Sequence, residues 1–258
     1  MPPVLGRHAP EVSCGYLAHA VVETARISVP TVLDSLRGKV SDERSTERLR
    51  SWARKILARA DVTLKVRGLD NCDLRQSYVI MSNHQSLYDI PTLYQALPLE
   101  FRMVAKSGLF RVPIWGRAML AAGFVKVDRS RGAEARTELK KRGAELQARG
   151  ISLWIAPEGT RSPDEQLLPL KSGGFHVALA LGFPILPVRI DGARLVHKKG
   201  SSQIFPGQRV RVTIHQPIEV NWAPDSATLD NTQVQFEVGL ERLRAEVRRV
   251  LEQAEPAD

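Results

Sequence analysis

Residues 78–96 read YVIMSNHQSLYDIPTLYQA, and this stretch decides the fold. Its apolar start, residues 78–81, predicts a buried strand, and its end, residues 87–96, predicts a helix. The same order of a short apolar run followed by a helical stretch recurs along the chain. Such alternation is typical of a largely parallel sheet covered by helices. The predicted fold class is therefore α/β, with a mostly parallel central sheet flanked by helices.

The remaining elements are predicted from the same two patterns. Strands are expected at residues 63–66, 78–81, 101–104, 123–127, 152–156, 185–190 and 210–215. Helices are expected at residues 87–96, 108–121, 133–149 and 171–181. A C-terminal amphipathic helix is expected at residues 232–252, because apolar residues recur there every three or four positions.

The alternation of short apolar runs and helical stretches begins only at residue 61. We therefore predict a helical N-terminal region, residues 1–60, before one larger domain, residues 61–258. Residues 16–60 are expected to form two helices, broken near Pro30 or within residues 38–42. In the second helix Leu49, Trp52 and Ile56 oppose a row of arginines. Such an amphipathic helix suits the headgroup zone of a membrane surface. A solvated helix packed on its own domain is the alternative that the pattern leaves open.

Composition narrows the class of protein. The chain has 258 residues, of which 43% are hydrophobic and 25% are charged, so disordered and fibrous classes are excluded. The net charge is +9, and residues 101–149 alone carry 12 Lys and Arg against 4 Asp and Glu. The cations therefore gather in the middle of the predicted sheet region, and the expected partners are anionic.

Several kinds of site have no support in the sequence. Cys14 and Cys72 stand far apart without a Cys or His cluster, so we expect two reduced, intracellular cysteines and no metal site, with a single disulfide as the minor alternative. No apolar run approaches the roughly 20 residues of a membrane span, and the N-terminus lacks a secretory signal pattern. Nucleotide-binding glycine loops, the serine hydrolase elbow and nucleic-acid recognition motifs are also missing. We therefore expect no cofactor and no nucleic-acid partner.

The chemistry is expected to centre on His84 and Asp89. Five residues apart, the two side chains would point in different directions on one continuous helix. They can meet if His84 lies in the loop before the helix and Asp89 in its first turn, a placement that also suits Pro91. An aspartate bonded to one ring nitrogen leaves the other nitrogen free to act as a general base at neutral pH. Taken alone, a histidine that only caps a strand–helix turn is the structural alternative.

Two further segments follow predicted strands and carry arginine. Residues 156–161 read APEGTR and offer a carboxylate, a glycine, a hydroxyl and a guanidinium, from Glu158, Gly159, Thr160 and Arg161. Arg129 stands just past the strand predicted at residues 123–127. Ligands of α/β proteins bind where strands end, and the arginine fork suits a phosphate. Each segment is a weak signal by itself, since a turn with a surface ion pair gives the same letters.

In this order and spacing, the segments resemble the glycerolipid acyltransferase family, which includes the lysophosphatidic acid acyltransferases. Four blocks carry the resemblance, and they are matched by Asn83, His84 and Asp89 (NHxxxxD), by Gly123 and Arg129, by residues 158–161 (EGTR), and by Pro187 in an apolar strand. The likeness covers about residues 62–217, which lie within the larger of the two predicted regions.

The resemblance implies a reaction and a role for each site residue. His84, oriented by Asp89, would take the proton from the free hydroxyl of a lysophospholipid as that oxygen attacks the thioester of acyl-CoA or acyl carrier protein. The expected acceptor is 1-acylglycerol 3-phosphate and the expected product is phosphatidic acid, formed without an acyl-enzyme. The remaining roles concern binding. Arg129 and Arg161 would hold the acceptor phosphate, Glu158 would orient an arginine or the acceptor hydroxyls, and Gly159 and Thr160 would shape the loop against the phosphate. Lys106 is a further candidate for a phosphate or for the 3′-phosphate of CoA, with a surface role as the alternative.

One departure from the family pattern bears on the acceptor. The second block commonly carries an aromatic residue three positions before its arginine, and this chain has Lys126 there. Two other acceptors therefore stay open, glycerol 3-phosphate and a lyso-aminolipid without phosphate. A basic module that binds a membrane or a nucleic acid is the non-enzyme alternative. The resemblance also implies a cytoplasmic protein that lies peripherally on the inner face of the cell membrane, with the anionic membrane surface as a partner.

Overall fold

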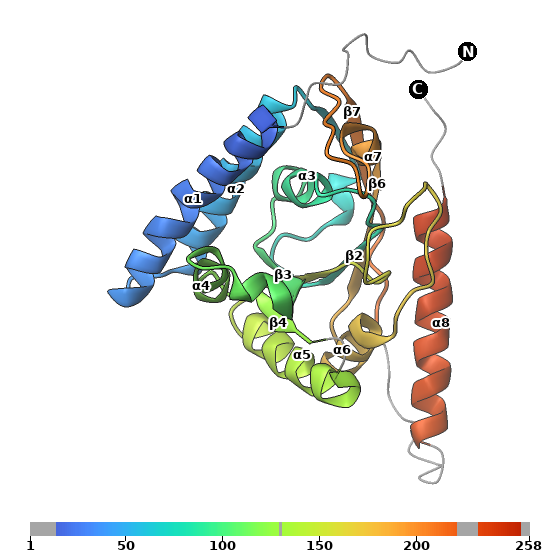
Figure 1. Ribbon diagram of the computed structural model, residues 1–258. Helices are drawn as coiled ribbons and strands as arrows, with labels where there is room; N and C mark the ends of the chain where they lie inside the picture. Colours follow the sequence, from blue (N-terminus) through green and yellow to red (C-terminus); the bar gives the residue numbers. More distant parts are fainter. Residues whose placement is uncertain (1–13, 129–130, 221–231, 254–258) are drawn as a thin grey trace, which may run out of the picture.

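A computed structural model of the protein describes residues 14–128, 131–220 and 232–253. Its centre is a seven-stranded sheet in the order β1-β7-β6-β2-β5-β3-β4 (Figure 1). The strands are β1 (Thr63–Arg67), β2 (Val79–Ser82), β3 (Phe101–Lys106), β4 (Val125–Val127), β5 (Ser152–Ile155), β6 (Ile185–Asp191) and β7 (Arg209–Ile214). Neighbouring strands are parallel except β6 and β7, which are antiparallel. The predicted α/β fold with a mostly parallel sheet is confirmed.

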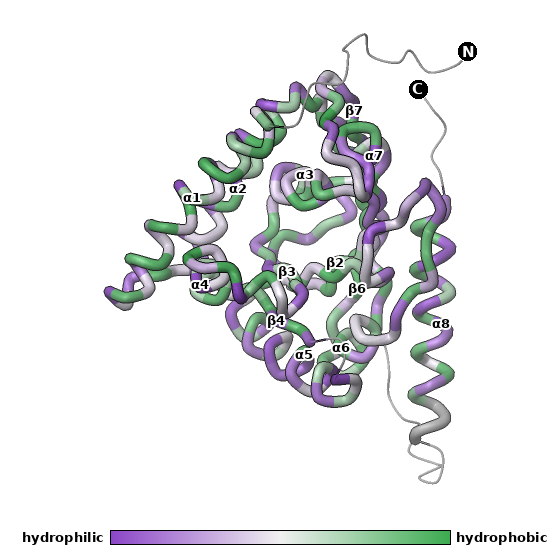
Figure 2. The backbone as a smooth tube through the Cα atoms, in the orientation of Figure 1, coloured by the Kyte–Doolittle hydropathy of each residue, from purple (hydrophilic) through white to green (hydrophobic). Residues whose placement is uncertain are grey.

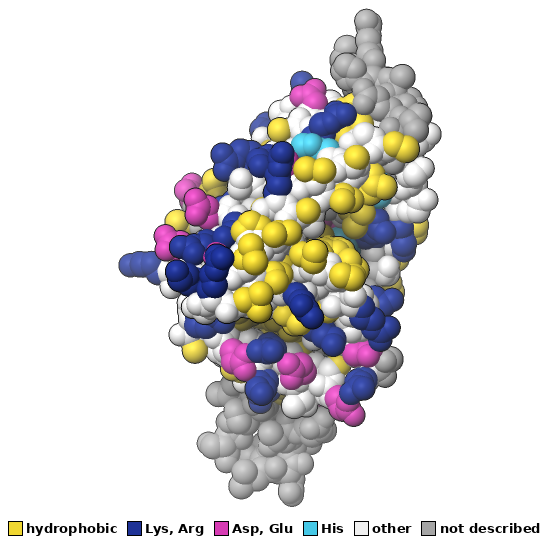
Figure 3. Space-filling model, turned by 60° about the vertical axis from the view of Figure 1, so that its left-hand side comes forward, with side chains coloured by type: hydrophobic (Ala, Val, Ile, Leu, Met, Phe, Trp, Pro, Cys, Tyr) yellow, Lys and Arg dark blue, Asp and Glu magenta, His cyan; other side chains and the backbone are white. Residues whose placement is uncertain are grey.

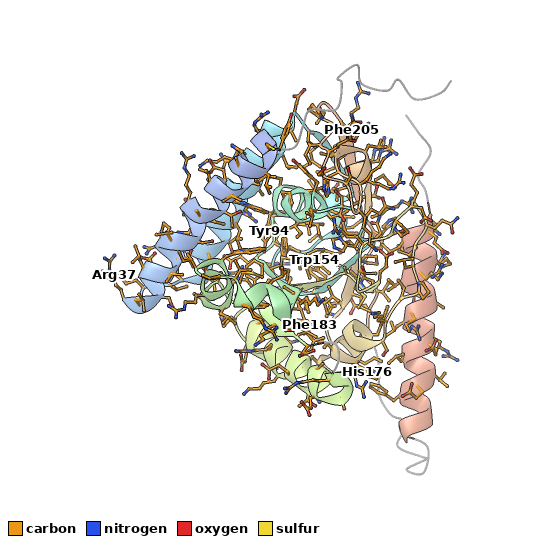
Figure 4. The ribbon with its side chains drawn as sticks, viewed as in Figure 1. Arg37, Tyr94, Trp154, His176, Phe183 and Phe205 are labelled. Carbon is orange, nitrogen blue, oxygen red and sulfur yellow. The ribbon has the colours of Figure 1, made fainter. Side chains whose placement is uncertain are left out.

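Helices cover both faces of the sheet and bury a separate apolar cluster on each. The first cluster joins the sheet to α1 (Cys14–Leu36), α2 (Asp42–Arg59) and α3 (Asp89–Ala96). The second joins it to α5 (Gly132–Gln147), α6 (Gly173–Leu181) and α8 (Thr232–Glu252). Successive residues of β2 point to opposite faces, so Ile80 lies in the first cluster and Met81 in the second. Tyr94 and Trp154 of the first cluster lie near the centre of the molecule (Figure 4).

One predicted helix is divided in the structure, and the break between the two N-terminal helices lies at one of its two predicted positions. Residues 108–121 form a 3₁₀ turn, η2 (Ser107–Arg111), followed by α4 (Trp115–Ala121), because Pro113 lies between them and has no N–H to donate. In the N-terminal region α1 continues through Pro30 and the break falls at residues 37–41, which agrees with the second of the two predicted positions. There Gly38 takes a left-handed conformation, and the Ser41 hydroxyl accepts a hydrogen bond from the Arg44 N–H and caps α2.

Some elements were not predicted from the sequence at all. They are η1 (Leu69–Asn71) and the short α7 (Ala193–Val196). The antiparallel direction of β7 relative to β6 was not predicted either. All three lie outside the strand–helix alternation that guided the prediction.

The helices α1 and α2 are held together by polar contacts. Glu23 is 2% exposed and accepts a hydrogen bond of 2.9 Å from Lys55, which lowers the pKa of Glu23 although burial opposes this. Trp52 Nε1 donates to Thr24 at 3.1 Å. Hydrophobic residues recur along α1, whereas α5 is mostly hydrophilic (Figure 2). Because polar groups occupy the inner side of α1, its apolar residues are left exposed, namely Leu17, Val21, Val22, Val29, Leu33 and Leu36.

A buried arginine ties α2 to the sheet. Arg102 on β3 is fully buried, and its Nη1 and Nη2 donate to the Thr46 hydroxyl at 3.0 Å and to the Asp42 carbonyl at 2.9 Å. Gly123 leaves room for this side chain, since a β-carbon there would lie 3.4 Å from Arg102 Nε and φ is +84°. The N-terminal helices therefore pack directly on the rest of the chain.

Candidate active site

His84 and Asp89 meet at the carboxyl end of β2. That strand ends at Ser82, His84 lies in the following loop, and α3 begins at Asp89. His84 Nδ1 lies 2.7 Å from Asp89 Oδ2, which also accepts the N–H groups of Gln85 at 2.8 Å and Ser86 at 2.9 Å. Asp89 is 1% exposed, whereas 17% of the His84 side chain is exposed. The predicted placement of the pair is confirmed, and no described residue hydrogen-bonds the other ring nitrogen, Nε2.

Packing and hydrogen bonds fix the position of the His84 ring. The ring lies edge-on to the indole of Trp154, with 6.1 Å between the centroids. Trp154 is held in turn by a hydrogen bond of 3.0 Å from its Nε1 to the Ser82 hydroxyl. The side chain of Asn83 binds both backbone groups of Ile190 on β6, donating to the carbonyl at 2.8 Å and accepting from the N–H at 2.7 Å. The loop that carries His84 is therefore anchored to both neighbouring strands.

Glu158 supports the backbone of His84. Its Oε1 accepts the His84 N–H at 2.7 Å, and its Oε2 accepts the Leu168 N–H at 2.9 Å. The Ser162 N–H closes a second link, donating to the His84 carbonyl at 2.7 Å. Burial raises the pKa of Glu158, and the two N–H groups oppose this. We expected Glu158 to orient an arginine or acceptor hydroxyls, whereas both of its oxygens bind the main chain here.

Arg161 carries unused hydrogen-bonding capacity. Its Nη1 is buried and has no hydrogen-bond partner in the described part of the chain. Its carbonyl accepts a hydrogen bond of 2.6 Å from Lys199 Nζ, which ties the loop to the segment after β6. Thr160, next to it, is exposed. An unpaired guanidinium nitrogen beside an exposed hydroxyl is suited to an oxyanion such as a phosphate.

The other predicted site residues lie at the same edge of the sheet or outside the described residues. Lys106 is exposed at the end of β3, where its backbone is paired with that of Val127 on β4. Lys126 on β4 is also exposed. Arg129 lies outside the described residues. Because β2, β3, β4 and β5 run in the same direction, their carboxyl ends meet at one edge and gather these loops.

Sequence reasoning missed two lysines that touch the EGTR loop. The stem of Lys171 lies over Gly159, where a β-carbon would come within 2.9 Å of Lys171 Cδ while φ is +71°. Lys199 reaches the Arg161 carbonyl from the loop after α7. Gly159 is therefore favoured for its left-handed backbone conformation, whereas the flexible Lys171 side chain could move away from a β-carbon. Lys171 was the first residue of the helix predicted at residues 171–181, whereas Lys199 had no signal beyond its place in a polar loop.

The remaining expectations concern metals and membrane spans. Among residues 14–128, 131–220 and 232–253, no group of three or more His, Cys, Asp or Glu side chains is placed to hold a metal ion. In the same ranges, none of the helices combines the length and the apolarity that a membrane crossing needs.

Comparisons with known proteins agree with this geometry. A model of the family described as Acyltransferase matches residues 63–191, which include His84, Asp89 and residues 158–161. The chain is 37% identical over 154 residues to a chloroplastic 1-acyl-sn-glycerol-3-phosphate acyltransferase, BAT2, of Brassica napus, which covers 59% of this chain and 44% of that protein. It is 31% identical over 159 residues to the human 1-acyl-sn-glycerol-3-phosphate acyltransferase alpha, covering 61% and 56% of the two chains. The chain thus aligns with about half the length of these relatives.

A solved structure has the same fold. The crystal structure of the 1-acyl-sn-glycerophosphate (LPA) acyltransferase PlsC from Thermotoga maritima superposes with a TM-score of 0.68 at 21% identity, over 93% of this chain and 96% of that one. At that identity the likeness concerns the fold. The match to the family model goes further than the fold, because it spans half of the chain and includes the paired His84 and Asp89. The chain belongs to the acyltransferase family.

Proposed function

We propose that the protein transfers a fatty acyl group from an acyl thioester to the free hydroxyl of 1-acyl-sn-glycerol 3-phosphate, which gives phosphatidic acid. The observation that carries this proposal is the 2.7 Å contact of His84 Nδ1 with Asp89, which leaves Nε2 of a partly exposed ring without a partner among the described residues. The proposal takes the acceptor from relatives whose names state it.

The geometry supports direct transfer by general base catalysis. Asp89 accepts a hydrogen bond from the N–H at Nδ1 and so keeps Nε2 as the basic nitrogen. Nε2 takes the proton of the acceptor hydroxyl while the oxygen attacks the thioester carbonyl carbon. The tetrahedral intermediate collapses by breaking the carbon–sulfur bond, and the thiolate takes the proton back from His84. Glu158 holds the His84 backbone still through these steps, because it accepts the His84 N–H.

The acceptor phosphate would bind at the EGTR loop. Arg161 offers a buried Nη1 without a partner in the described residues, and Thr160 offers an exposed hydroxyl. Lys106, exposed at the end of the neighbouring strand β3, is a further candidate, and Arg129 is assigned to the same phosphate from the motif alone. A phosphate-bearing acceptor is favoured over a lyso-aminolipid, because an unpaired guanidinium nitrogen binds an anionic phosphate oxygen more strongly than any group of a headgroup without phosphate.

The test is to incubate the purified protein with a panel of acceptors and to identify the products by mass spectrometry. The panel contains 1-acylglycerol 3-phosphate, glycerol 3-phosphate and a phosphate-free lyso-aminolipid, each with acyl-CoA and with acyl carrier protein thioester. We expect phosphatidic acid as the main product. Acylation of glycerol 3-phosphate or of the lyso-aminolipid in its place would assign the enzyme to another acceptor. Absence of any acyl transfer would contradict the proposal.

We further propose that the enzyme meets its lipid acceptor by docking on an anionic membrane surface through α1 and α4. The exposed residues of α1 include Leu17 at 64%, Val21 at 60% and Leu36 at 79%. The adjacent α4 and the turn before it expose further apolar residues, namely Leu109, Val112, Ile114, Trp115 and Leu120. Figure 3 shows hydrophobic side chains gathered on this side of the molecule with Lys and Arg at their margins. Such a combination is typical of an interfacial surface.

Replacing two of these residues is expected to release the protein from membranes. The double substitution Val21→Asp and Leu33→Asp should lower partitioning to vesicles that contain phosphatidylglycerol by at least about tenfold, because full burial of each side chain contributes roughly 1.5–3 kcal/mol. Vesicle sedimentation measures the effect. Val238→Asp on α8, where the valine is 47% exposed, is the matched control and should leave binding unchanged. Equal losses in both variants would contradict a specific docking face.

A further inference from the structure

A groove runs along β4, one of the two edge strands of the sheet. Its volume is about 540 Å³, within the range of small-molecule sites. One side is formed by η2, α4 and β4, with Ser107, Arg111, Leu120, Phe124 and Lys126. The other side is formed by one face of α5, with Arg131, Glu134, Glu138 and Arg142 among its residues. In Figure 1, β4 lies between α4 and α5. His84 and Arg161 do not line this groove.

The two sides of the groove differ in whether their cations are paired with carboxylates. On α5 the cations are already paired: Arg131 lies 3.2 Å from Glu134, and Arg142 lies 3.2 Å from Glu138. On the other side, Arg111 and Lys126 are both exposed, and neither side chain makes an ion pair or hydrogen bond with the described residues. The groove therefore offers two free cations that face a wall of carboxylates held in place by arginines.

This composition fits a nucleotide better than a plain anion. Free cations bind phosphates, and the carboxylates of Glu134 and Glu138 can accept hydrogen bonds from ribose hydroxyls or a base amino group. Phe124, half-buried on the same side as the free cations, supplies an apolar surface against which a base can lie.

The groove is within reach of the catalytic histidine for a long thioester. β4 and β2 are separated by β5 and β3 in the sheet order, and three strand spacings amount to roughly 14 Å. An extended pantetheine arm is longer than this separation. A nucleotide held beside β4 can therefore place its thioester near His84 at the carboxyl end of β2.

We propose that this groove binds the phosphates and the nucleoside of the acyl donor, an acyl-CoA, with Arg111 and Lys126 as the phosphate-binding residues. The proposal rests on the proposed function, since it assigns a place to the donor of that reaction. The donor and the acceptor then approach His84 from different loops. Their phosphates bind separate cations, Arg111 and Lys126 for the donor and Arg161 for the acceptor.

The direct test is calorimetric binding of adenosine 3′,5′-bisphosphate and of CoA to the full chain. The double variant Arg111→Gln and Lys126→Gln should raise both dissociation constants at least about tenfold, and binding to the parent protein should weaken with salt. Arg136→Gln with Lys140→Gln is the matched control, because these exposed α5 cations do not line the groove. The control should bind within twofold of the parent protein. Absence of nucleotide binding by the parent protein, or an equal loss in the control, would overturn the proposal.

Kinetics separate this proposal from the proposed function. The double variant Arg111→Gln and Lys126→Gln should raise the KM for acyl-CoA about tenfold. The KM for the acceptor and the kcat should stay unchanged. A matching rise in the acceptor KM would overturn the assignment to the donor. Weaker binding to phosphatidylglycerol vesicles with unchanged nucleotide binding would overturn it in favour of a lipid headgroup. Because the calorimetry needs no turnover, failure of the proposed reaction leaves the binding result intact.

Discussion

Replacing His84 with alanine is expected to lower kcat by about 10²- to 10⁴-fold, the range that a positioned general base contributes. No neighbouring described group is placed to take over, since Asp89 is 1% exposed and its Oδ2 already accepts three hydrogen bonds. The acceptor and donor KM values should change little, because the imidazole acts on the reacting hydroxyl and not on either phosphate. Steady-state kinetics with 1-acylglycerol 3-phosphate measure the effect.

Two comparisons make this result specific. His176→Ala is the matched control: His176 lies on α6, stacks on Phe236 and should be dispensable for turnover. Asp89→Asn should also lower kcat strongly, because an amide in place of the carboxylate can donate to Nδ1 and favour the wrong tautomer. Thermal unfolding of each variant checks that the fold is kept. Full activity of a folded His84→Ala protein would exclude the proposed base.

The parts of the fold that sequence reasoning predicted share a simple physical origin. The core strands β2, β5 and β6 are largely buried on both faces, so each contains a short apolar run that a sequence pattern detects. The helix α8 was predicted with the observed bounds, because its apolar residues recur at helical spacing over five turns or more. The register and direction of a strand cannot be predicted in this way, since they depend on partner strands far along the chain. Nothing local in residues 209–214 distinguishes an antiparallel β7 from a parallel one.

In the candidate site, too, contacts between residues close in sequence could be predicted, and contacts between residues far apart in sequence could not. His84 and Asp89 are close in sequence, so the turn that brings them together could be inferred from Pro91 and the expected helix start. The role of Glu158 could not, because its two partners, His84 and Leu168, lie 74 and 10 positions away. The sequence pattern proposes which side chains carry the chemistry. Only the folded chain shows that the carboxylate of Glu158 binds the main chain of His84 and Leu168.

The second large effect is expected at Arg161. Replacing Arg161 with alanine should raise the KM for 1-acylglycerol 3-phosphate by about 100-fold, because it removes up to two hydrogen bonds to a charged phosphate, each contributing about 1.5–3 kcal/mol. The backbone of the loop should keep its place, since the Lys199 contact is to the Arg161 carbonyl and the Glu158 contacts are to the main chain of His84 and Leu168. The KM for the acyl donor should stay unchanged.

Three comparisons then separate charge, geometry and nonspecific damage. Arg161→Lys keeps the charge but loses the two-pronged geometry, so it should restore part of the affinity and not all of it. Arg75→Ala removes an exposed arginine that pairs with Asp73 in the loop before β2, at the opposite end of that strand from His84, and should have no effect. A phosphate-free lyso-aminolipid, if it is acylated at all, should be used equally by the parent protein and by Arg161→Ala. An unchanged KM for 1-acylglycerol 3-phosphate in Arg161→Ala would mean that the buried, unpartnered guanidinium nitrogen serves the loop and not the substrate, and the acceptor phosphate would have to bind elsewhere.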